Sequence, residues 1–221
     1  MYLPAQRKRF DQCLIPLEPV AEQHHLRLLV DSVTSLSPEE HQVRLASGER
    51  IHYAQVVIAA GFIARREAIP GGKTYALFPC DVEDAQHLCE RFERMRQGTL
   101  TLIIEEPRPG PGLEYIDWMA RSLQERRRNQ ITLQLIDGQP RLMAHLGERA
   151  GIHLEQIVSK LGVRLLTGQA EALITEQEVR LNAGQCVASD LTAVVGSLHG
   201  VDLGLTAPVV NEQRFVCVNA P

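Results

Sequence analysis

Apolar positions in the middle of the chain follow the order of buried strands and amphipathic helices. Residues 100–104 form a continuous apolar run of strand length, and residues 131–136 are the next predicted strand. Between them, apolar residues recur at helical spacing over 113–123, and another apolar helical face spans 152–161. This order predicts a β–α–β unit with parallel strands, which is the unit that binds dinucleotides.

Part of the sequence occurs twice, in the same order and at nearly constant spacing. Val-Arg-Leu-Ala-Ser-Gly-Glu-Arg-Ile returns as Val-Arg-Leu-Asn-Ala-Gly-Gln-Cys-Val, and Leu-Arg-Leu-Leu returns as Val-Arg-Leu-Leu. Each copy also runs into an apolar strand that ends in small residues. The matched pairs are 43–51 with 179–187, 26–29 with 163–166 and 56–61 with 192–196. Three matched elements favour a duplication over two unrelated strand–turn–strand pieces.

The duplication predicts what should precede the first copy. In the second copy, a strand, a Pro/Gly loop over 107–112 and a helix come before the repeated part. The first copies lie 136 or 137 positions earlier (43 against 179, 26 against 163), so the matching loop would lie before residue 1. We therefore expect the first nucleotide-binding unit to lack its phosphate-binding start.

The first copy also carries a family resemblance. Residues 51–61, Ile-His-Tyr-Ala-Gln-Val-Val-Ile-Ala-Ala-Gly, resemble the tyrosine–aspartate–x–leucine–valine–isoleucine–alanine–threonine–glycine stretch of the pyridine nucleotide–disulfide oxidoreductases. Ala54 replaces the aspartate and Ala60 the threonine. Residues 211–219 are similar to the strand shortly before the family's carboxyl-terminal glycine–aspartate FAD motif. Within the family, the sulfide:quinone oxidoreductases and type II NADH dehydrogenases are the most similar.

The resemblance implies two dinucleotide-binding domains, one for FAD and an inserted one that binds NAD(P)H or is a degenerate equivalent. Residues 1–84 are expected to be the carboxyl-terminal part of the first FAD-binding segment. Residues 85–196 are expected to be the inserted NAD(P)-binding-like domain, and residues 197–221 the start of the return to the FAD domain. The expected fold class is α/β, a Rossmann-like parallel-sheet domain with an incomplete second FAD/NAD(P)-binding domain. Because both FAD motifs are missing, we expect the sequence to be truncated or partial.

Small residues at the strand ends are candidate cofactor contacts. Ala59, Ala60 and Gly61 resemble the place where the family's FAD passes close to the backbone, and close approach needs small side chains. Gly196 ends the matching strand of the second copy. The alternative is an ordinary strand end that turns into a loop, which also favours glycine.

Four residues of the inserted domain are candidates for the second nucleotide. Gly110 lies in the loop before the helix, and Gly112 and Glu114 align with the end of the family's glycine fingerprint. Asp137 ends the second strand, where the fingerprint places the acid that binds ribose hydroxyls. An Asp-Gly turn is also common by itself.

Other residues of the same loop disfavour a phosphate. Pro107 and Pro109 stand where the first two glycines are usual, and proline has no N–H to donate. Glu105 and Glu106 add negative charge that would repel a phosphate. Two alternatives therefore stay open: an NADH-binding domain, and a degenerate domain such as the sulfide:quinone oxidoreductases have.

The resemblance makes Cys80 the candidate catalytic residue. The family has one redox cysteine in the connection between its domains, where Cys80 falls here. The second redox cysteine has no counterpart, because residues 105–114 contain no cysteine. A buried structural thiol is the alternative for Cys80, and Cys89 is expected to pack within a helix over 82–96.

Composition and charge narrow the class of function. The 221 residues are 44% hydrophobic and 5% aromatic with a net charge of −4, which is ordinary for a globular protein and does not suggest nucleic acid. No apolar stretch approaches the roughly 20 residues that span a bilayer, and no signal segment follows Met1. Five scattered cysteines are typical of reduced cytosolic thiols, and eight histidines show no metal-ligand spacing. We expect a cytoplasmic location, with peripheral membrane association possible for the full-length parent.

Together these features predict a FAD-dependent oxidoreductase that passes electrons from sulfide or NADH to an acceptor such as a quinone. FAD is the expected cofactor of the parent, with NAD(P)H as the second candidate. Small-molecule electron donors and acceptors are the expected partners. The alternative is a non-catalytic remnant that binds a nucleotide or a partner protein, which the missing FAD motifs and the loop prolines favour. Donor, acceptor and oligomeric state stay open.

Overall fold

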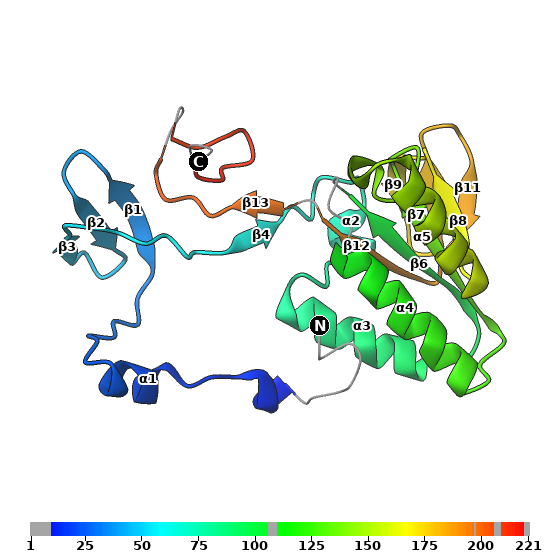
Figure 1. The fold of residues 1–221 in the computed structure, drawn as a ribbon, viewed down its shortest axis with the longest axis horizontal. Helices are drawn as coiled ribbons and strands as arrows, with labels where there is room; N and C mark the ends of the chain where they lie inside the picture. Colours follow the sequence, from blue (N-terminus) through cyan, green and yellow to red (C-terminus); the bar gives the residue numbers. More distant parts are fainter. Residues whose placement is uncertain (1–9, 106–109, 197, 206–208, 219–221) are drawn as a thin grey trace. The chain divides into compact units, whose positions relative to one another are not determined.

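The structure is a computed structural model that describes residues 10–105, 110–196, 198–205 and 209–218. The chain forms two compact units (Figure 1). Unit 1 comprises Met1–Cys13 and Ala64–Ser197, and unit 2 comprises Leu14–Ile63 and Leu198–Pro221. Along the sequence, unit 1 therefore interrupts unit 2.

Unit 1 is built on a five-stranded sheet in the order β5-β12-β6-β7-β8, in which every neighbouring pair is parallel. The strands are β5 (Ala76–Leu77), β6 (Gly98–Ile104), β7 (Ile131–Asp137), β8 (Arg164–Thr167) and β12 (Leu191–Val195). The central strands β12, β6 and β7 are almost entirely buried, as expected for parallel strands covered on both faces. β6 and β7 confirm the two strands predicted from apolar runs.

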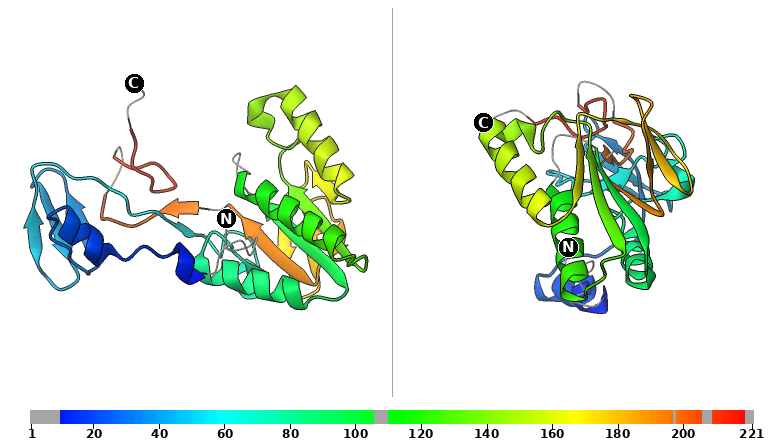
Figure 2. Two further views of the ribbon diagram at one scale, coloured as in Figure 1. Left: turned by 60° about the horizontal axis from the view of Figure 1, so that its bottom comes forward. Right: turned by 90° about the vertical axis from the view of Figure 1, so that its right-hand side faces the viewer.

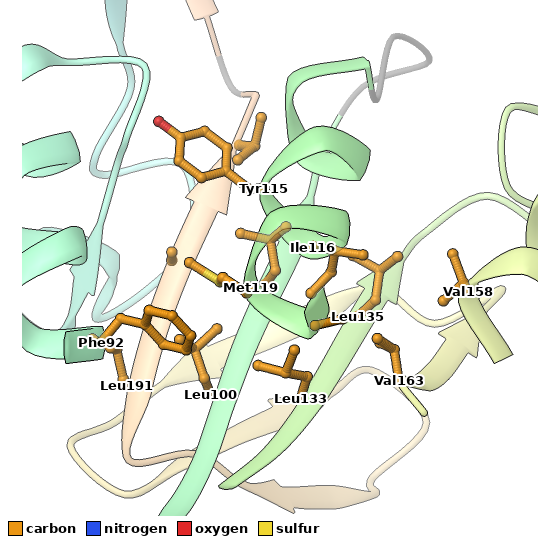
Figure 3. Close-up of a cluster of buried hydrophobic side chains, with 14 of the residues drawn as sticks. Phe92, Leu100, Tyr115, Ile116, Met119, Leu133, Leu135, Val158, Val163 and Leu191 are labelled. Carbon is orange, nitrogen blue, oxygen red and sulfur yellow. The ribbon is translucent and has the colours of Figure 1, made fainter. Parts of the chain in front are cut away.

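Helices cover one face of this sheet (Figure 1 and Figure 2). They are α3 (Val82–Arg94), α4 (Gly110–Glu125) and α5 (Glu148–Lys160). Their apolar side chains pack with alternate residues of the strands in one cluster. In Figure 3, Ile116 and Met119 of α4 point toward Leu100, Leu133 and Leu135 of the two central strands.

A small antiparallel sheet covers the opposite face. Its strands are β9 (Glu171–Ile174), β10 (Glu178–Leu181) and β11 (Cys186–Ala188). Val179 and Val187 of this sheet pack with Ile103, Ile136 and other inward residues of the parallel sheet. Unit 1 therefore has three layers: helices, a parallel sheet and an antiparallel sheet. The α/β, Rossmann-like fold class is confirmed.

Two helix boundaries differ from the sequence prediction. α4 begins at Gly110, three residues before the apolar periodicity, because Pro111 is well tolerated in the first turn of a helix, where its missing N–H has no partner to lose. α3 begins at Val82, as predicted, and ends at Arg94. Its start is set by Asp81, whose carboxylate accepts hydrogen bonds from the N–H groups of Glu83 and Asp84.

The long segment of unit 1 begins at Ala64, whereas the sequence pattern led us to place the start of the inserted domain at residue 85. The reason is β5, a two-residue strand that pairs in parallel with β12 and brings residues 64–84 into unit 1. A strand this short has no detectable periodicity. The short helices of unit 1 are the 3₁₀ segments Phe10–Cys13 and Ala144–Leu146 and α2 (Gly72–Tyr75).

Unit 2 is smaller and has its own small core. A short helix, α1 (Leu17–Gln23), precedes an antiparallel sheet with the strands β1 (Val33–Ser37), β2 (Gln42–Leu45) and β3 (Arg50–His52). β4 (Phe62–Ala64) pairs with β13 (Leu198–Gly200). Leu36, Leu203 and Leu205 form the buried centre.

The sequence repeat is also a repeat of backbone geometry. The hairpins β2–β3 and β10–β11 have the same register, with Val43 opposite Ile51 and Val179 opposite Val187. Both turn at a glycine of positive φ, +90° at Gly48 and +83° at Gly184, where an L side chain would be strained. Each copy therefore forms its own antiparallel sheet, and the hairpins of the two sheets have the same register.

The structural repeat begins before the first residues at which the two copies match in sequence. At the end of α1, the N–H of Leu26 donates to the carbonyl oxygen of Ala21 at 2.8 Å. The N–H of Val163 makes the corresponding bond to Val158 at the end of α5, at 3.3 Å, with both residues shifted by 137. Helix α1 is thus the counterpart of α5, and each copy runs from a helix through a strand-length segment and a small sheet to an apolar segment.

Candidate functional site

The candidate site is the carboxyl edge of the parallel sheet in unit 1. Val195 of β12 is paired with Ile104 of β6, and Ile104 is paired with Asp137 of β7, so the three strands end side by side. Gly196 and Glu105 follow directly on these ends. In open α/β sheets, ligands bind outside this edge. The fold therefore brings Gly196, Glu105 and Asp137 together where a nucleotide would bind.

Gly112 lets helix α4 pack closely on this edge. A Cβ at Gly112 would lie 2.9 Å from Cγ1 of Ile104, which is closer than real Cβ atoms come. The last glycine of a dinucleotide fingerprint has this packing role. Gly110 is the first residue of α4, and Glu114 is exposed one turn further on. The proposed contacts of these three residues with a cofactor remain predictions.

Gly196 lies against the backbone of the neighbouring strand. Its φ is +123°, and a Cβ would be 2.0 Å from the carbonyl oxygen of Glu105. The Glu105 N–H donates to the carbonyl of Val195 at 2.9 Å, which holds the two strand ends together. Gly196 is thus required by the packing of the strands, whether or not a cofactor binds.

Glu105 places a carboxylate at this edge. Its Oε2 atom is buried and has no hydrogen-bond partner among the described residues. A buried carboxylate oxygen without a donor disfavours a second anion nearby. Glu106, Pro107 and Pro109, which the sequence analysis also associated with this loop, lie outside the described residues.

Asp137 is turned into the protein. Its side chain is 2% exposed, and Oδ1 accepts a hydrogen bond from the N–H of Gln139 at 2.8 Å. Burial raises the pKa of Asp137, and the Gln139 hydrogen bond lowers it in part. An acid that binds ribose hydroxyls must offer them its oxygens, and in this conformation Asp137 caps its own turn instead.

We expect Asp137→Asn to raise the free energy of unfolding near pH 7. The pKa of Asp137 in the folded protein is above its ordinary value of 3.8. The folded protein therefore loses stability relative to the unfolded protein as pH rises from 3.8 through the folded pKa, because the buried side chain must then carry a charge. The amide oxygen of asparagine can still accept from Gln139. Chemical unfolding of both proteins should show this advantage near pH 7 and none below pH 3.8. An asparagine variant that is less stable at neutral pH would contradict the burial argument.

Cys80 lies at the same edge, in the connection between β5 and α3. It is half-buried, and its sulfur faces the backbone of Gly196. Burial raises the pKa of the Cys80 thiol, and the Gly196 contact opposes this rise. Tyr115 of α4 is close by, since its hydroxyl donates to the carbonyl of Pro79 at 2.9 Å. Reactive cysteines have a lowered pKa, so these surroundings favour a structural thiol, and the redox role remains a prediction.

We expect alkylation to separate the five thiols. Cys13, Cys186 and Cys217 are exposed, whereas burial raises the pKa of Cys89 to about 11 from 9.0. Two pKa units mean about a hundredfold less thiolate near neutral pH. With iodoacetamide at about pH 8 and peptide mass spectrometry, the exposed thiols should react first, then Cys80 and last Cys89. In urea all five should react alike. A native Cys80 that reacts first would instead support a redox thiol.

Sequence reasoning missed Tyr115 and a buried polar pair. Tyr115 is one helical turn before Met119, and that spacing was the available signal for its burial. Gln134 of β7 is buried and donates to the hydroxyl of Thr101 at 2.6 Å and to the carbonyl of Ala188 at 2.8 Å. These bonds tie the parallel sheet to the end of β11, and no local pattern indicates them.

The FAD candidates Ala59, Ala60 and Gly61 belong to unit 2. All three are exposed, and Gly61 has a φ of +71° with open space where a Cβ would be. A cofactor could therefore approach the backbone here. Their role in binding stays a prediction.

Among the helices in the described ranges, none has the length and apolar character to cross a bilayer.

The known proteins that resemble this chain include reductases and oxidoreductases. No protein-family profile matches the chain. A curated relative is the ferredoxin reductase subunit of 5,5'-dehydrodivanillate O-demethylase from Sphingobium sp. (strain NBRC 103272 / SYK-6). It is 28% identical over 205 residues, which cover 86% of this chain and 45% of the relative.

Two solved structures share the fold over most of the chain. The sulfide:quinone oxidoreductase of Aquifex aeolicus has a TM-score of 0.86 at 19% identity, covering 97% of this chain and 53% of that protein. The ferredoxin reductase for the CYP199A2 system of Rhodopseudomonas palustris has a TM-score of 0.72 at 19% identity, covering 89% and 47%. This chain spans about half the length of each of these proteins. It therefore shares the fold of these oxidoreductases and reductases over about half of their length.

Proposed function

We propose that this chain is part of a flavin-dependent oxidoreductase that passes electrons from sulfide or NADH to an acceptor such as a quinone. The observation that carries the proposal is the match of both units together, a TM-score of 0.86 over 97% of the chain, to a sulfide:quinone oxidoreductase. The repeat supports it, because two nucleotide-binding units of common origin are what such an enzyme needs. The activity would belong to the whole protein.

The residues that would hold FAD are Ala59, Ala60 and Gly61, in the segment of unit 2 that leads into β4. Gly61 has open space where a side chain would be, and Ala59 and Ala60 add only methyl groups. This arrangement fits a cofactor that lies against the backbone. When bound, the flavin would accept electrons from the donor and pass them on, while the protein positions it and tunes its potential.

The carboxyl edge of unit 1 fits a second dinucleotide less well. Gly112 and Gly196 give the close packing of a nucleotide-binding unit. Glu105, however, adds a carboxylate whose Oε2 atom is buried, and Asp137 accepts a hydrogen bond within its own turn. We infer that NADH does not bind at this edge in the conformation described, which favours sulfide over NADH as the donor.

Flavin absorbance tests the proposal. We expect the purified chain, after incubation with FAD and gel filtration, to retain the visible absorbance of a bound flavin. Gly61→Val should abolish it, because valine fills the open space beside the backbone. Gly48→Val is the matched control, since Gly48 also has positive φ and open surroundings but lies in the β2–β3 turn. A colourless wild-type chain would support the non-catalytic alternative instead.

Titration with NADH tests the donor. We expect no saturable quenching of Trp118 fluorescence in the wild-type chain, because the Glu105 carboxylate repels the diphosphate. Saturable binding by the wild type would remove the preference for sulfide. Binding that appears with Glu105→Gln would identify the charge as the cause.

A further inference from the structure

Tyr115 connects helix α4 to the turn that carries Cys80. Its side chain is 5% exposed, and its hydroxyl donates to the carbonyl oxygen of Pro79 at 2.9 Å. The bond is buried. A buried phenol needs an acceptor for its hydroxyl, because an unpaired buried donor costs free energy. The bond therefore holds together two segments of unit 1 that are far apart along the chain.

The turn consists of Phe78, Pro79, Cys80 and Asp81. The N–H of Asp81 donates to the carbonyl oxygen of Phe78 at 2.9 Å, which closes a β-turn with proline at its favoured second position. The N–H of Phe78 donates to Oδ2 of Asp84 at 2.7 Å, and Asp81 is the N-cap of α3. Both ends of the turn are thus tied to α3, whereas its central peptide is tied to α4 by the hydroxyl bond.

The direction of the Cys80 side chain depends on this central peptide. Rotation of the peptide that joins Pro79 to Cys80 changes the φ angle of Cys80, which is the difference between the common turn types, and so turns its side chain. In the structure the sulfur faces the backbone of Gly196, which follows the end of β12. That end belongs to the carboxyl edge, where sheets of this kind bind their ligands.

We propose that Tyr115 is the positioning residue of Cys80: its hydroxyl fixes the Pro79–Cys80 peptide and so keeps the sulfur at the carboxyl edge of the sheet. The inference rests on the proposed function, for which Cys80 is the candidate redox thiol, and it gives Tyr115 itself no reaction step. The alternative is a purely apolar role, since the Tyr115 ring packs in the helix-side core with residues such as Met119.

The hydroxyl of Tyr115 remains a donor while the thiol titrates. Burial raises the pKa of Tyr115 above its ordinary value of 10.0, and the nearby Cys89 and Cys80 add to this rise. Burial also raises the pKa of Cys80 above 9.0. Tyr115 therefore keeps its proton above pH 10.0, and its bond to Pro79 does not depend on the neutral pH range in which thiols are usually studied.

Tyr115→Phe tests the proposal, because it removes the hydroxyl and keeps the ring. The Pro79 carbonyl then loses its donor inside the protein, so we expect the turn to shift until this oxygen reaches water. Cys80 should move with the turn, and its rate of alkylation by iodoacetamide should rise at least about threefold. The pH midpoint of that rate should fall toward 9.0, because water replaces the burial that raises the pKa of Cys80.

An internal reference and a matched variant make the test specific. Cys89 is buried on α3, and its alkylation should not change, because only the turn before α3 is released. Met119→Leu is the control, since Met119 is 0% exposed and lies one turn after Tyr115 on the same helix. It exchanges apolar side chains of similar volume, so both thiols should react as in the wild type. Peptide mass spectrometry measures the rates, and circular dichroism checks the fold.

Each outcome decides between positioning and packing. An unchanged or slower reaction of Cys80 in Tyr115→Phe would overturn the proposal, as would a faster reaction without a lower pH midpoint. Equal increases at Cys80 and Cys89 would overturn it as well, because they would show that the whole unit has loosened. These measurements need no flavin. A chain that binds no FAD but shows the increase at Cys80 alone would therefore support the role of Tyr115 and count against the flavin proposal.

Discussion

Gly196→Ala should destabilise unit 1 by at least about 3 kcal/mol, a large share of the roughly 5–15 kcal/mol that stabilises a typical domain. The new methyl group would be 2.0 Å from the carbonyl oxygen of Glu105, and the φ of +123° is one that L residues rarely adopt. The clash is with backbone rather than with a flexible side chain. Both strand ends are held in the sheet by the bond between Glu105 and Val195, so neither can move away cheaply.

Gly184→Ala is the control that separates the clash from the strain of positive φ. Gly184 has a φ of +83°, and no atom lies within 4 Å of the position of a Cβ. We expect it to lose only about 1 kcal/mol, the cost of the backbone conformation. Urea unfolding followed by the fluorescence of Trp118, the single tryptophan, measures unit 1. Equal losses in the two variants would mean that the strand ends separate easily.

Phe92→Ala should cost about 3–5 kcal/mol of unit 1 stability, the usual range for emptying a buried aromatic site. Phe92 of α3 is fully buried in the helix-side core. Its ring meets Trp118 of α4 edge-to-face at 5.2 Å between centroids, and the guanidinium of Arg128 lies 5.1 Å from the ring centroid. The substitution therefore removes an aromatic pair and a cation–π contact together with the apolar burial.

Leu146→Ala is the matched control for Phe92. Leu146 is an apolar residue of the same unit but is largely exposed, so its truncation should change stability by less than about 0.5 kcal/mol. Circular dichroism in urea follows both variants, because loss of Phe92 also changes the surroundings of Trp118. A Phe92 variant with near-native stability would show that the core collapses around the cavity.

Local sequence pattern was sufficient for the elements that carry their own periodicity. β6 and β7 are rich in apolar residues over the length of a strand, and α3 has Asp81 as its N-cap ahead of an amphipathic stretch. The repeated hairpins were recognisable because residues 43–51 match residues 179–187 in sequence, and each copy has a glycine, Gly48 or Gly184, at its turn. In each case the signal lies within a few residues, and the backbone preferences of those residues account for the structure.

The sequence predicted where the candidate site lies, but not the conformation and contacts of its residues. The sequence placed Gly112, Asp137 and Gly196 at strand ends or a helix start, and they do lie at one edge of the sheet. It could not show that Asp137 caps its own turn. Nor could it show that the backbone of Gly196 lies near Cys80, which is distant along the chain.

The sequence by itself thus determined the α/β class, the central strands, the helix α3 and the internal repeat. Tertiary structure alone decided that β5 joins the sheet, that a small antiparallel sheet covers the face opposite the helices, and that one copy of the repeat is covered while the other is exposed. The physical reason is the range of the contacts. Helix caps, turns and periodicity are set by neighbouring residues, whereas parallel pairing and burial depend on segments far apart along the chain.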